Sequence, residues 1–272
     1  MPELPEVETT RRGLEPLLVG QRIRAAVVRD RRMRQPVPRR LPGLLAGATI
    51  RSLARRGKYL LVDCGAGTLI LHLGMSGRLW VVRDGAPPAA HDHFDLVLEN
   101  GTVVRLRDPR RFGLVLWQAG DPFAHALLAR IGPEPLSPGF DGAALHAATR
   151  NRSAAIKQVL MDSHVVAGVG NIYANEALFR ARIHPRTSAG RLSRGRCDRL
   201  VRMIRETLER AIVAGGSSLR DYVRSDGLAG NYQNQFTVYD RAGEPCPRCA
   251  SSIREIRQGQ RSTFFCPKCQ KA

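Results

Sequence analysis

The sequence predicts an α+β protein in three parts: an antiparallel β-sandwich with an N-terminal helix packed on it, a helical segment, and a small C-terminal β-ribbon that binds a metal. Three observations support this. Short β-rich segments follow one another without helices up to residue 106, the pattern then becomes helical, and four cysteines lie near the C-terminus. The predicted boundaries are 1–132 for the sandwich, 133–238 for the helical domain and 239–272 for the ribbon.

The composition points to a nucleic-acid partner. A chain of 272 residues with 43% hydrophobic residues can build one large or two ordinary domains. Its net charge of +19, from 43 Lys and Arg against 24 Asp and Glu, indicates binding to a polyanion, and an unrelated Arg-rich enzyme is the alternative. The chain shows no signal sequence, no membrane-length apolar run and no sign of oligomerisation. We therefore expect a monomer in the cytoplasm, associated with the nucleoid, without a membrane partner.

The first helix is predicted directly behind the N-terminus. Pro5 suits the first turn of a helix, because the amide hydrogen that proline lacks has no helical partner there. Gly20 can end the helix. The apolar stripe on its inner face is formed by Val7, Leu14 and Leu18.

The residues before this helix could carry chemistry. Removal of Met1 would expose the secondary amine of Pro2, which could attack a sugar C1′ and form a charged iminium. A helix N-terminus carries partial positive charge, which lowers the pKa of a nearby amine and attracts phosphate. Glu3 would place a carboxylate beside that nitrogen. The alternative is that Pro2 and Pro5 merely begin a capped helix.

The rest of the N-terminal part is predicted to be β-structure. Glycine-containing hairpin turns lie at 65–67 and 100–101. Strands joined without helices should pair antiparallel, as a sandwich or a barrel. The expected strands are 23–28, 59–62, 68–73, 79–82, 94–98 and 103–106.

The helical part follows a proline-rich linker at 133–138. Helices are expected over 153–161 and 171–182, and a third has its apolar stripe from Cys197 to Ile212. Asn171 can cap the second helix behind Gly168 and Gly170, a weak signal for a phosphate site. Cys197 is expected in the core, and Cys64 has no surroundings that suggest catalysis. The segment 217–235, poor in large apolar residues, is interpreted from its composition as an ordinary surface loop.

The spacing of the cysteines at the C-terminus is by itself a specific signal for a metal site. Cys246-x-x-Cys249, a gap of 16 residues and Cys266-x-x-Cys269 match a four-thiolate Zn²⁺ site, which leaves no open coordination position and is therefore structural. Strands are expected over 253–257 and 262–265.

Several of these motifs together resemble one family. The resemblance lies in the opening Met-Pro-Glu-Leu-Pro-Glu-Val-Glu-Thr, in the run Gly-Val-Gly-Asn-Ile-Tyr-Ala-Asn-Glu that ends at Glu176, and in the paired cysteines. In these motifs the chain resembles the formamidopyrimidine-DNA glycosylases, bacterial enzymes that excise oxidised purines. The resemblance implies a helix–two-turn–helix in the middle domain and double-stranded DNA containing a damaged base as the partner. It also implies that Pro2 is the nucleophile and that Glu3 is an acid near the ribose.

The same resemblance implies further roles. Lys58 would assist β-elimination, Arg261 would reach the lesion phosphates and support δ-elimination, and 217–235 would cap the extruded base. Glu176 would support a turn, with a surface salt bridge as its alternative. The residues implied to contact DNA are His72, Met75, His91, Arg110, Phe112, Arg152, Lys157 and Asn171.

Among these residues, Met75, Arg110 and Phe112 would form a wedge that enters the duplex where the base has left. Taken alone, the Met and Phe would more often be core residues, the histidines loop or core residues, and Lys58 a solvated lysine at a strand start.

Two other functions stay open at this point. The endonuclease VIII branch prefers oxidised pyrimidines, and Leu4 together with the wedge set favours the purine-lesion enzyme instead. A zinc-ribbon DNA-binding protein without enzymatic activity is the alternative of a different class, and the Pro2-Glu3 pair with Lys58 argues against it. The sequence thus predicts a glycosylase that also nicks the strand by β,δ-elimination, with one structural Zn²⁺.

Overall fold

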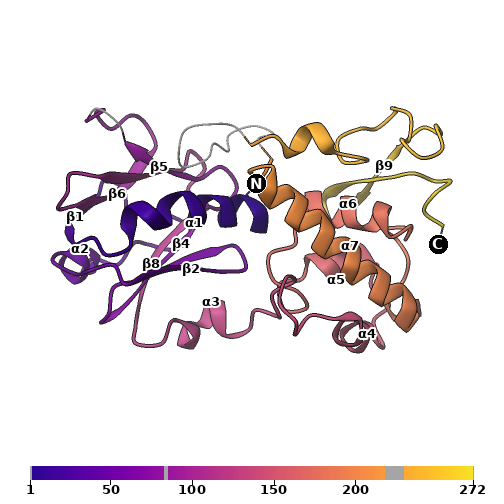
Figure 1. The fold of residues 1–272 in the computed structure, drawn as a ribbon, viewed down its shortest axis with the longest axis horizontal. Coiled ribbons are helices and arrows are strands. Elements are labelled where there is room, and N and C mark those ends of the chain that lie inside the picture. The colour runs from indigo at the N-terminus through magenta and orange to yellow at the C-terminus, as the bar shows by residue number, and fades with distance from the viewer. Residues whose placement is uncertain (1, 83–84, 218–229, 272) are drawn as a thin grey trace. The chain divides into compact units, whose positions relative to one another are not determined.

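A computed structural model of the protein describes residues 2–82, 85–217 and 230–271. The chain forms two compact units, each of which is described by itself. The first comprises Met1–Arg130 with Ala214–Asn231, and the second comprises Ile131–Val213 with Tyr232–Ala272. Figure 1 labels their elements along the chain. In the described part of the chain, no helix has both the length and the apolarity needed to cross a membrane.

Two four-stranded antiparallel sheets form the first unit, as the sequence predicts. One sheet has the order β1 (Ile23–Val28), β6 (Asp92–Leu98), β7 (Val103–Arg107) and β5 (Arg78–Val82). The other has the order β2 (Ser52–Arg56), β3 (Tyr59–Asp63), β4 (Gly67–His72) and β8 (Leu114–Ala119). The six predicted strands are present within one or two residues, and β2 and β8 were missed. Short helices α2 (Leu41–Leu45), η1 (Pro122–Ala124) and α3 (Ala126–Ala129) complete the unit.

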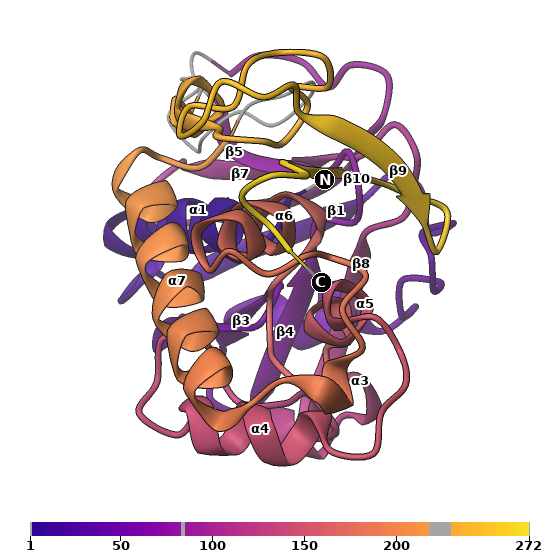
Figure 2. The same ribbon diagram turned by 90° about the vertical axis from the view of Figure 1, so that its right-hand side faces the viewer.

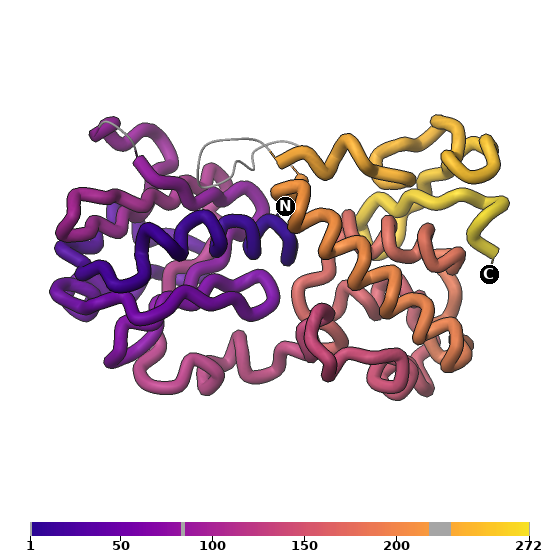
Figure 3. The backbone as a smooth tube through the Cα atoms, viewed as in Figure 1, coloured from indigo at the N-terminus to yellow at the C-terminus, as the bar shows by residue number. Residues whose placement is uncertain are grey.

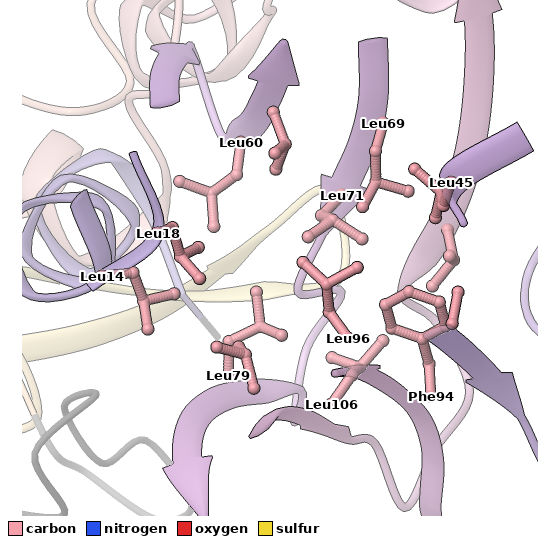
Figure 4. Packing of buried hydrophobic residues seen from close by; sticks show 14 of the residues in the cluster. Leu14, Leu18, Leu45, Leu60, Leu69, Leu71, Leu79, Phe94, Leu96 and Leu106 are labelled. Atoms are coloured by element: carbon pink, nitrogen blue, oxygen red, sulfur yellow. The ribbon is translucent and has the colours of Figure 1, made fainter. Parts of the chain in front are cut away.

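Helix α1 (Leu4–Leu18) packs against this sandwich and completes its core. Leu14 and Leu18 point from the helix toward leucines of both sheets, among them Leu60 and Leu96 (Figure 4). All four side chains are at most 3% exposed. Beyond the helix Gly20 takes a φ of +84°, a left-handed conformation that favours glycine, so the predicted stop is confirmed.

Four helices form most of the second unit (Figure 2). They are α4 (Gly142–Thr149), α5 (Ile156–Met161), α6 (Asn171–Arg180) and α7 (Arg194–Val213), with short 3₁₀ turns η2 (Ala189–Arg191) and η3 (Tyr232–Gln235). Helices α4 and α6 pack against α7, whose buried stripe is the predicted one. The predicted ends were wrong by a few residues: α5 begins at Ile156, and α6 ends before Arg182, which has a φ of +56°.

The C-terminal ribbon belongs to this second unit. Strands β9 (Arg254–Gln258) and β10 (Arg261–Phe265) pair antiparallel, as predicted, and Figure 3 draws this part of the chain in yellow near the C-terminus. Gly259 and Gln260 both have positive φ, 51° and 62°, as a two-residue type I′ hairpin requires. This turn places Arg261 first on β10. A small cluster that includes Ile253 and Phe264 packs the ribbon against Phe179 of α6.

Candidate active site

The N-terminus of α1 holds Pro2 and Glu3 in buried positions. Glu3 is the N-cap residue and Glu6 the third helical residue, and the two form a reciprocal capping box. Each carboxylate accepts from the other residue's backbone N–H, with 2.8 Å between Glu3 N and Glu6 Oε2. The Glu3 carboxylate is thereby fixed at the positive end of the helix, next to the residue whose nitrogen is the predicted nucleophile.

Glu6 also connects this site to a segment far along the chain. Its Oε1 accepts from the backbone N–H of Ser217 at 2.8 Å and from the Ser217 hydroxyl at 3.1 Å. Gly216 lies so close that a Cβ there would be 3.1 Å from Glu6 Oε1, and Ser217 forms a β-bridge with Asn231. The base of the predicted lesion-capping loop 217–235 therefore lies against α1. The loop's central residues, 218–229, lie outside the described residues.

Arg55 of β2 links α1 to the turn that carries Lys58. Its Nε donates to Glu8 Oε2 at 3.1 Å, and its Nη1 donates to the carbonyl of Gly57 at 3.0 Å. The Glu8 and Arg55 side chains are each only 11% exposed, so this ion pair is shielded more than a surface pair. Arg55 thus joins α1 to Gly57, the residue directly before Lys58.

His72 at the end of β4 is a neutral imidazole at physiological pH. Burial, together with the positive charges of Lys58 and Arg34, lowers its pKa to about 4. Its Nδ1 accepts a hydrogen bond from the backbone N–H of Gly74 at 2.9 Å, so this nitrogen carries no proton. Toward a phosphate His72 could act only as a neutral donor through Nε2, which leaves the positive charge to Lys58 and Arg34.

Acid should weaken the fold through His72. Because its native pKa of about 4 lies below the ordinary 6.5, the unfolded chain binds the proton first, and stability falls as the pH drops from 6.5 to 4. The loss is at most about 3 kcal/mol. His72→Asn offers an acceptor near the position of Nδ1 without a titrating group, and should flatten this part of the profile. Urea midpoints between pH 4 and 7 measure it, and parallel profiles for the two proteins would exclude the assignment.

The predicted wedge residues lie exposed on two adjacent turns. Met75 is 36% and Phe112 43% exposed, so the alternative that they are core residues is wrong. The Arg110 guanidinium carbon lies 4.7 Å from the centre of the Phe112 ring, within cation–π range. His91 is exposed and has a φ of +71°. Its carbonyl oxygen accepts a hydrogen bond from the backbone N–H of Asp108.

In the second unit, Lys157 was predicted to contact DNA, but it does not lie on the surface. The side chain is buried, and its Nζ donates to the carbonyl of Ser262 at 2.9 Å and to Thr263 Oγ1 at 2.6 Å. Asn171 Nδ2 donates to the same Ser262 carbonyl at 3.1 Å, and Asn175 Oδ1 accepts from the N–H of Phe264 at 2.8 Å. A buried ammonium needs such partners, and here it attaches β10 to α5.

Asn171 and Arg152 also differ in detail from the expectation. Gly170, not Asn171, is the N-cap of α6, and Asn171 is the first helical residue with its amide turned to the ribbon. Arg152, whose side chain is 43% exposed, lies 3.4 Å from Asp162 in an ion pair. The phosphate contacts of both residues stay predictions.

Glu176 is fully buried, so the alternative of a surface salt bridge is wrong. Its carboxylate accepts from the backbone N–H groups of Thr237, Val238 and Tyr239, and from the Thr237 hydroxyl. Three amides directed at one carboxylate fix the segment that leads into the ribbon.

The four predicted cysteines converge at the open end of the ribbon, before β9 and after β10, opposite the hairpin turn. Their sulfur atoms all lie within 4.8 Å of one another, with 3.9 Å from Cys246 to Cys269 and 3.5 Å from Cys249 to Cys266. Tetrahedral Zn²⁺ with bonds of about 2.3 Å places its sulfur ligands about 3.8 Å apart, so the set fits this ion. The backbone N–H groups of Arg248 and Cys269 point at two of the sulfurs, as expected around thiolates.

Comparison with known proteins covers nearly the whole chain. Three family models match: the formamidopyrimidine-DNA glycosylase N-terminal domain at residues 1–115, the H2TH domain of the same enzymes at 131–223, and the zinc finger found in FPG and IleRS at 243–272.

The chain belongs to the formamidopyrimidine-DNA glycosylase family.

A formamidopyrimidine-DNA glycosylase of Alkalilimnicola ehrlichii is 55% identical, with both chains fully covered. The crystal structure of the MutM (FPG) protein of Thermus thermophilus is 41% identical, with a TM-score of 0.89 over 99% of this chain and 98% of that one. Wild-type Lactococcus lactis Fpg in complex with DNA containing N7-benzyl-Fapy-dG is 37% identical, with a TM-score of 0.92 and both chains fully covered. Membership of the glycosylase family establishes the ribbon as a zinc finger with one structural Zn²⁺.

Several residues around the site of this family member have little or no signal in the sequence. Glu6 had a detectable signal, because a glutamate three residues after the N-cap is the capping-box spacing. Arg34 and Asn175 had none, since each acquires its partners only in the folded chain. Burial raises the pKa of the Cys64 thiol to about 11, in agreement with the absence of a catalytic role for it.

Proposed function

We propose that this protein releases oxidised purines, 8-oxoguanine and formamidopyrimidines, from duplex DNA through Pro2 and then cuts the strand by β,δ-elimination. The chain is a DNA repair glycosylase of its family, acting on damaged bases. The observation that carries the finer proposal is the placement of Pro2 directly before the buried, capping-box-bound Glu3 at the N-terminus of α1. Chromosomal DNA as substrate would place the protein at the nucleoid.

The proposed reaction needs a free nitrogen on Pro2, and hence removal of Met1. The nitrogen attacks C1′ of the damaged nucleotide, the C1′–base bond breaks, and Glu3 protonates or orients the opening sugar. The resulting iminium acidifies the C2′ proton. Loss of that proton breaks the bond to the 3′ oxygen, and a second elimination breaks the bond to the 5′ oxygen. Lys58, which follows the Gly57 carbonyl that Arg55 binds, assists the first elimination.

Trapping the iminium tests this proposal. Borohydride should reduce the intermediate formed with an 8-oxoguanine duplex to a stable secondary-amine link, and mass spectrometry should locate the DNA on Pro2. An otherwise identical duplex with guanine is the control. Pro2→Gly should greatly weaken base excision, because a primary amine replaces the secondary one. An adduct on a lysine, or no adduct from protein shown to lack Met1, would refute the assignment of Pro2.

Arg261 should affect the second elimination more than the first. It is exposed at the start of β10, directly behind the hairpin turn, where a guanidinium can reach phosphates. Arg261→Ala should leave β-elimination product in place and reduce the δ-product several-fold, by about tenfold if the phosphate contact is lost. Product ratios on a sequencing gel measure this. Arg254→Ala, at the far end of the same ribbon, is the matched control, and equal ratios for both variants would contradict the role.

A further inference from the structure

The two wedge turns meet backbone to backbone in the first unit. A Cβ on Gly74 would lie 2.5 Å from the backbone N of Gly113 and from the carbonyl carbon of Phe112. A Cβ on Gly113 would in turn lie 2.7 Å from the carbonyl oxygen of His72. Only glycine fits at either position, so the turn that carries Met75 packs directly against the turn that carries Phe112, with no side chain between them.

One buried carboxylate joins these turns. Asp108 is 0% exposed; its Oδ1 accepts from the Ser76 hydroxyl at 2.8 Å, and its Oδ2 accepts from the backbone N–H of Gly113 at 2.7 Å. Ser76 follows Met75 directly, and Gly113 follows Phe112. Each arm of the wedge is therefore attached to the same side chain by the residue next to its tip.

The backbone of Asp108 is also held in place by hydrogen bonds. Its backbone N–H donates to the carbonyl of His91 at 3.0 Å, and its carbonyl lies 2.9 Å from Nε2 of the buried His93. Within the described residues, the carboxylate has no basic side chain in an ion pair. Its desolvation is offset by the two turn donors, which makes separation of the turns from Asp108 unfavourable.

We propose that Asp108 is a positioning residue for duplex opening, which keeps Met75, Arg110 and Phe112 as one rigid wedge. The inference rests on the proposed function, because the wedge acts only where a base must leave the stack. A loose wedge would fill the vacated space poorly, so the base would spend less time extruded. The chemistry at Pro2 would be unaffected once the sugar had reached it. Asp108 thus acts on base extrusion through the wedge residues.

The test compares two substrates with the same flanking sequence. Asp108→Ala should slow single-turnover release of 8-oxoguanine opposite cytosine by about tenfold or more, because both turn contacts are lost. Cleavage at a preformed abasic site, where no damaged base has to be extruded, should stay within about twofold. Asp108→Asn can still accept from Gly113 and donate to Ser76, and should restore most of the rate. Ser76→Ala removes one contact only and should give an intermediate loss even if Asp108→Ala does not fold.

Controls separate the possible outcomes. Asp121→Asn changes a carboxylate of the same unit that caps η1 beyond the opposite end of β8 from Gly113, and should match the unaltered protein on both substrates. Equal losses on the two substrates, or no loss for Asp108→Ala and Ser76→Ala at unchanged melting temperature, would overturn the role of Asp108. Failure of the unaltered chain to form the borohydride adduct would instead refute the proposed function.

Discussion

Glu3→Gln is expected to abolish base release while DNA binding persists. General acid–base groups contribute about 10²- to 10⁴-fold to rates, and a loss in this range is expected for the single-turnover step. Gln can still accept the Glu6 N–H through its amide oxygen, so the capping box and the start of α1 should survive. The variant removes the ability to transfer a proton and little else.

Single-turnover excision of 8-oxoguanine and a binding titration on the same duplex measure the two effects separately. Glu15→Gln is the matched control, since Glu15 lies on the same helix with its side chain 46% exposed and paired with Arg11. It should behave like the unaltered protein. A Glu3→Gln variant with near-normal excision would remove the carboxylate from the mechanism, and one that no longer binds DNA or folds would assign it to structure instead.

Removal of the metal should have the largest effect on stability. Four-thiolate Zn²⁺ sites contribute an apparent ~10–16 kcal/mol in comparable modules, and the ribbon's own apolar cluster is small. Cys249→Ser, or chelation, should therefore unfold β9 and β10 and release Arg261 from its position. DNA binding and strand cleavage should both fall as a result.

Zinc content, limited proteolysis of the ribbon and DNA affinity check this expectation. Cys64→Ala is the control, because Cys64 is buried in the first unit and is not one of the four clustered cysteines. It should keep one Zn²⁺ per chain and a protected ribbon. A Cys249→Ser protein with full zinc content and unchanged affinity would contradict the structural role of the metal. The sodium borohydride adduct should still form slowly in the metal-free protein, since the zinc takes no part in the chemistry.

Much of the fold follows from local signals. Short β-rich runs bounded by turn residues identified six of the eight sandwich strands, and the missed β2 has only one buried residue, Leu53, so its pattern is weak. The α7 stripe was visible because seven of its apolar residues repeat at helical spacing. The end of α6 was misplaced because Arg182 carries no residue-type signal for its positive φ.

The site divides in the same way. The spacing of the cysteine pairs identifies the zinc ligands before any folding is known. The catalytic roles of Pro2 and Glu3 are predicted from their adjacency together with the family resemblance. The direction in which a long side chain points could not be predicted from the sequence. Lys157 was expected to face DNA, yet its ammonium reaches Thr263, 106 residues away, which only the packing of the ribbon on α5 makes possible.

The sequence by itself determined most of the elements with their order and the zinc ligands, because periodicity and spacing are local properties. The roles of Pro2 and Glu3 came from the family resemblance and stay a prediction. Only the tertiary structure decided which groups meet across long separations. Glu6 binds Ser217, which lies 211 residues further along the chain. Asp108 binds Ser76, which lies 32 residues before it, and so joins the two wedge turns. Such contacts depend on how the sheets and helices pack, and buried carboxylates take the donors that packing brings to them.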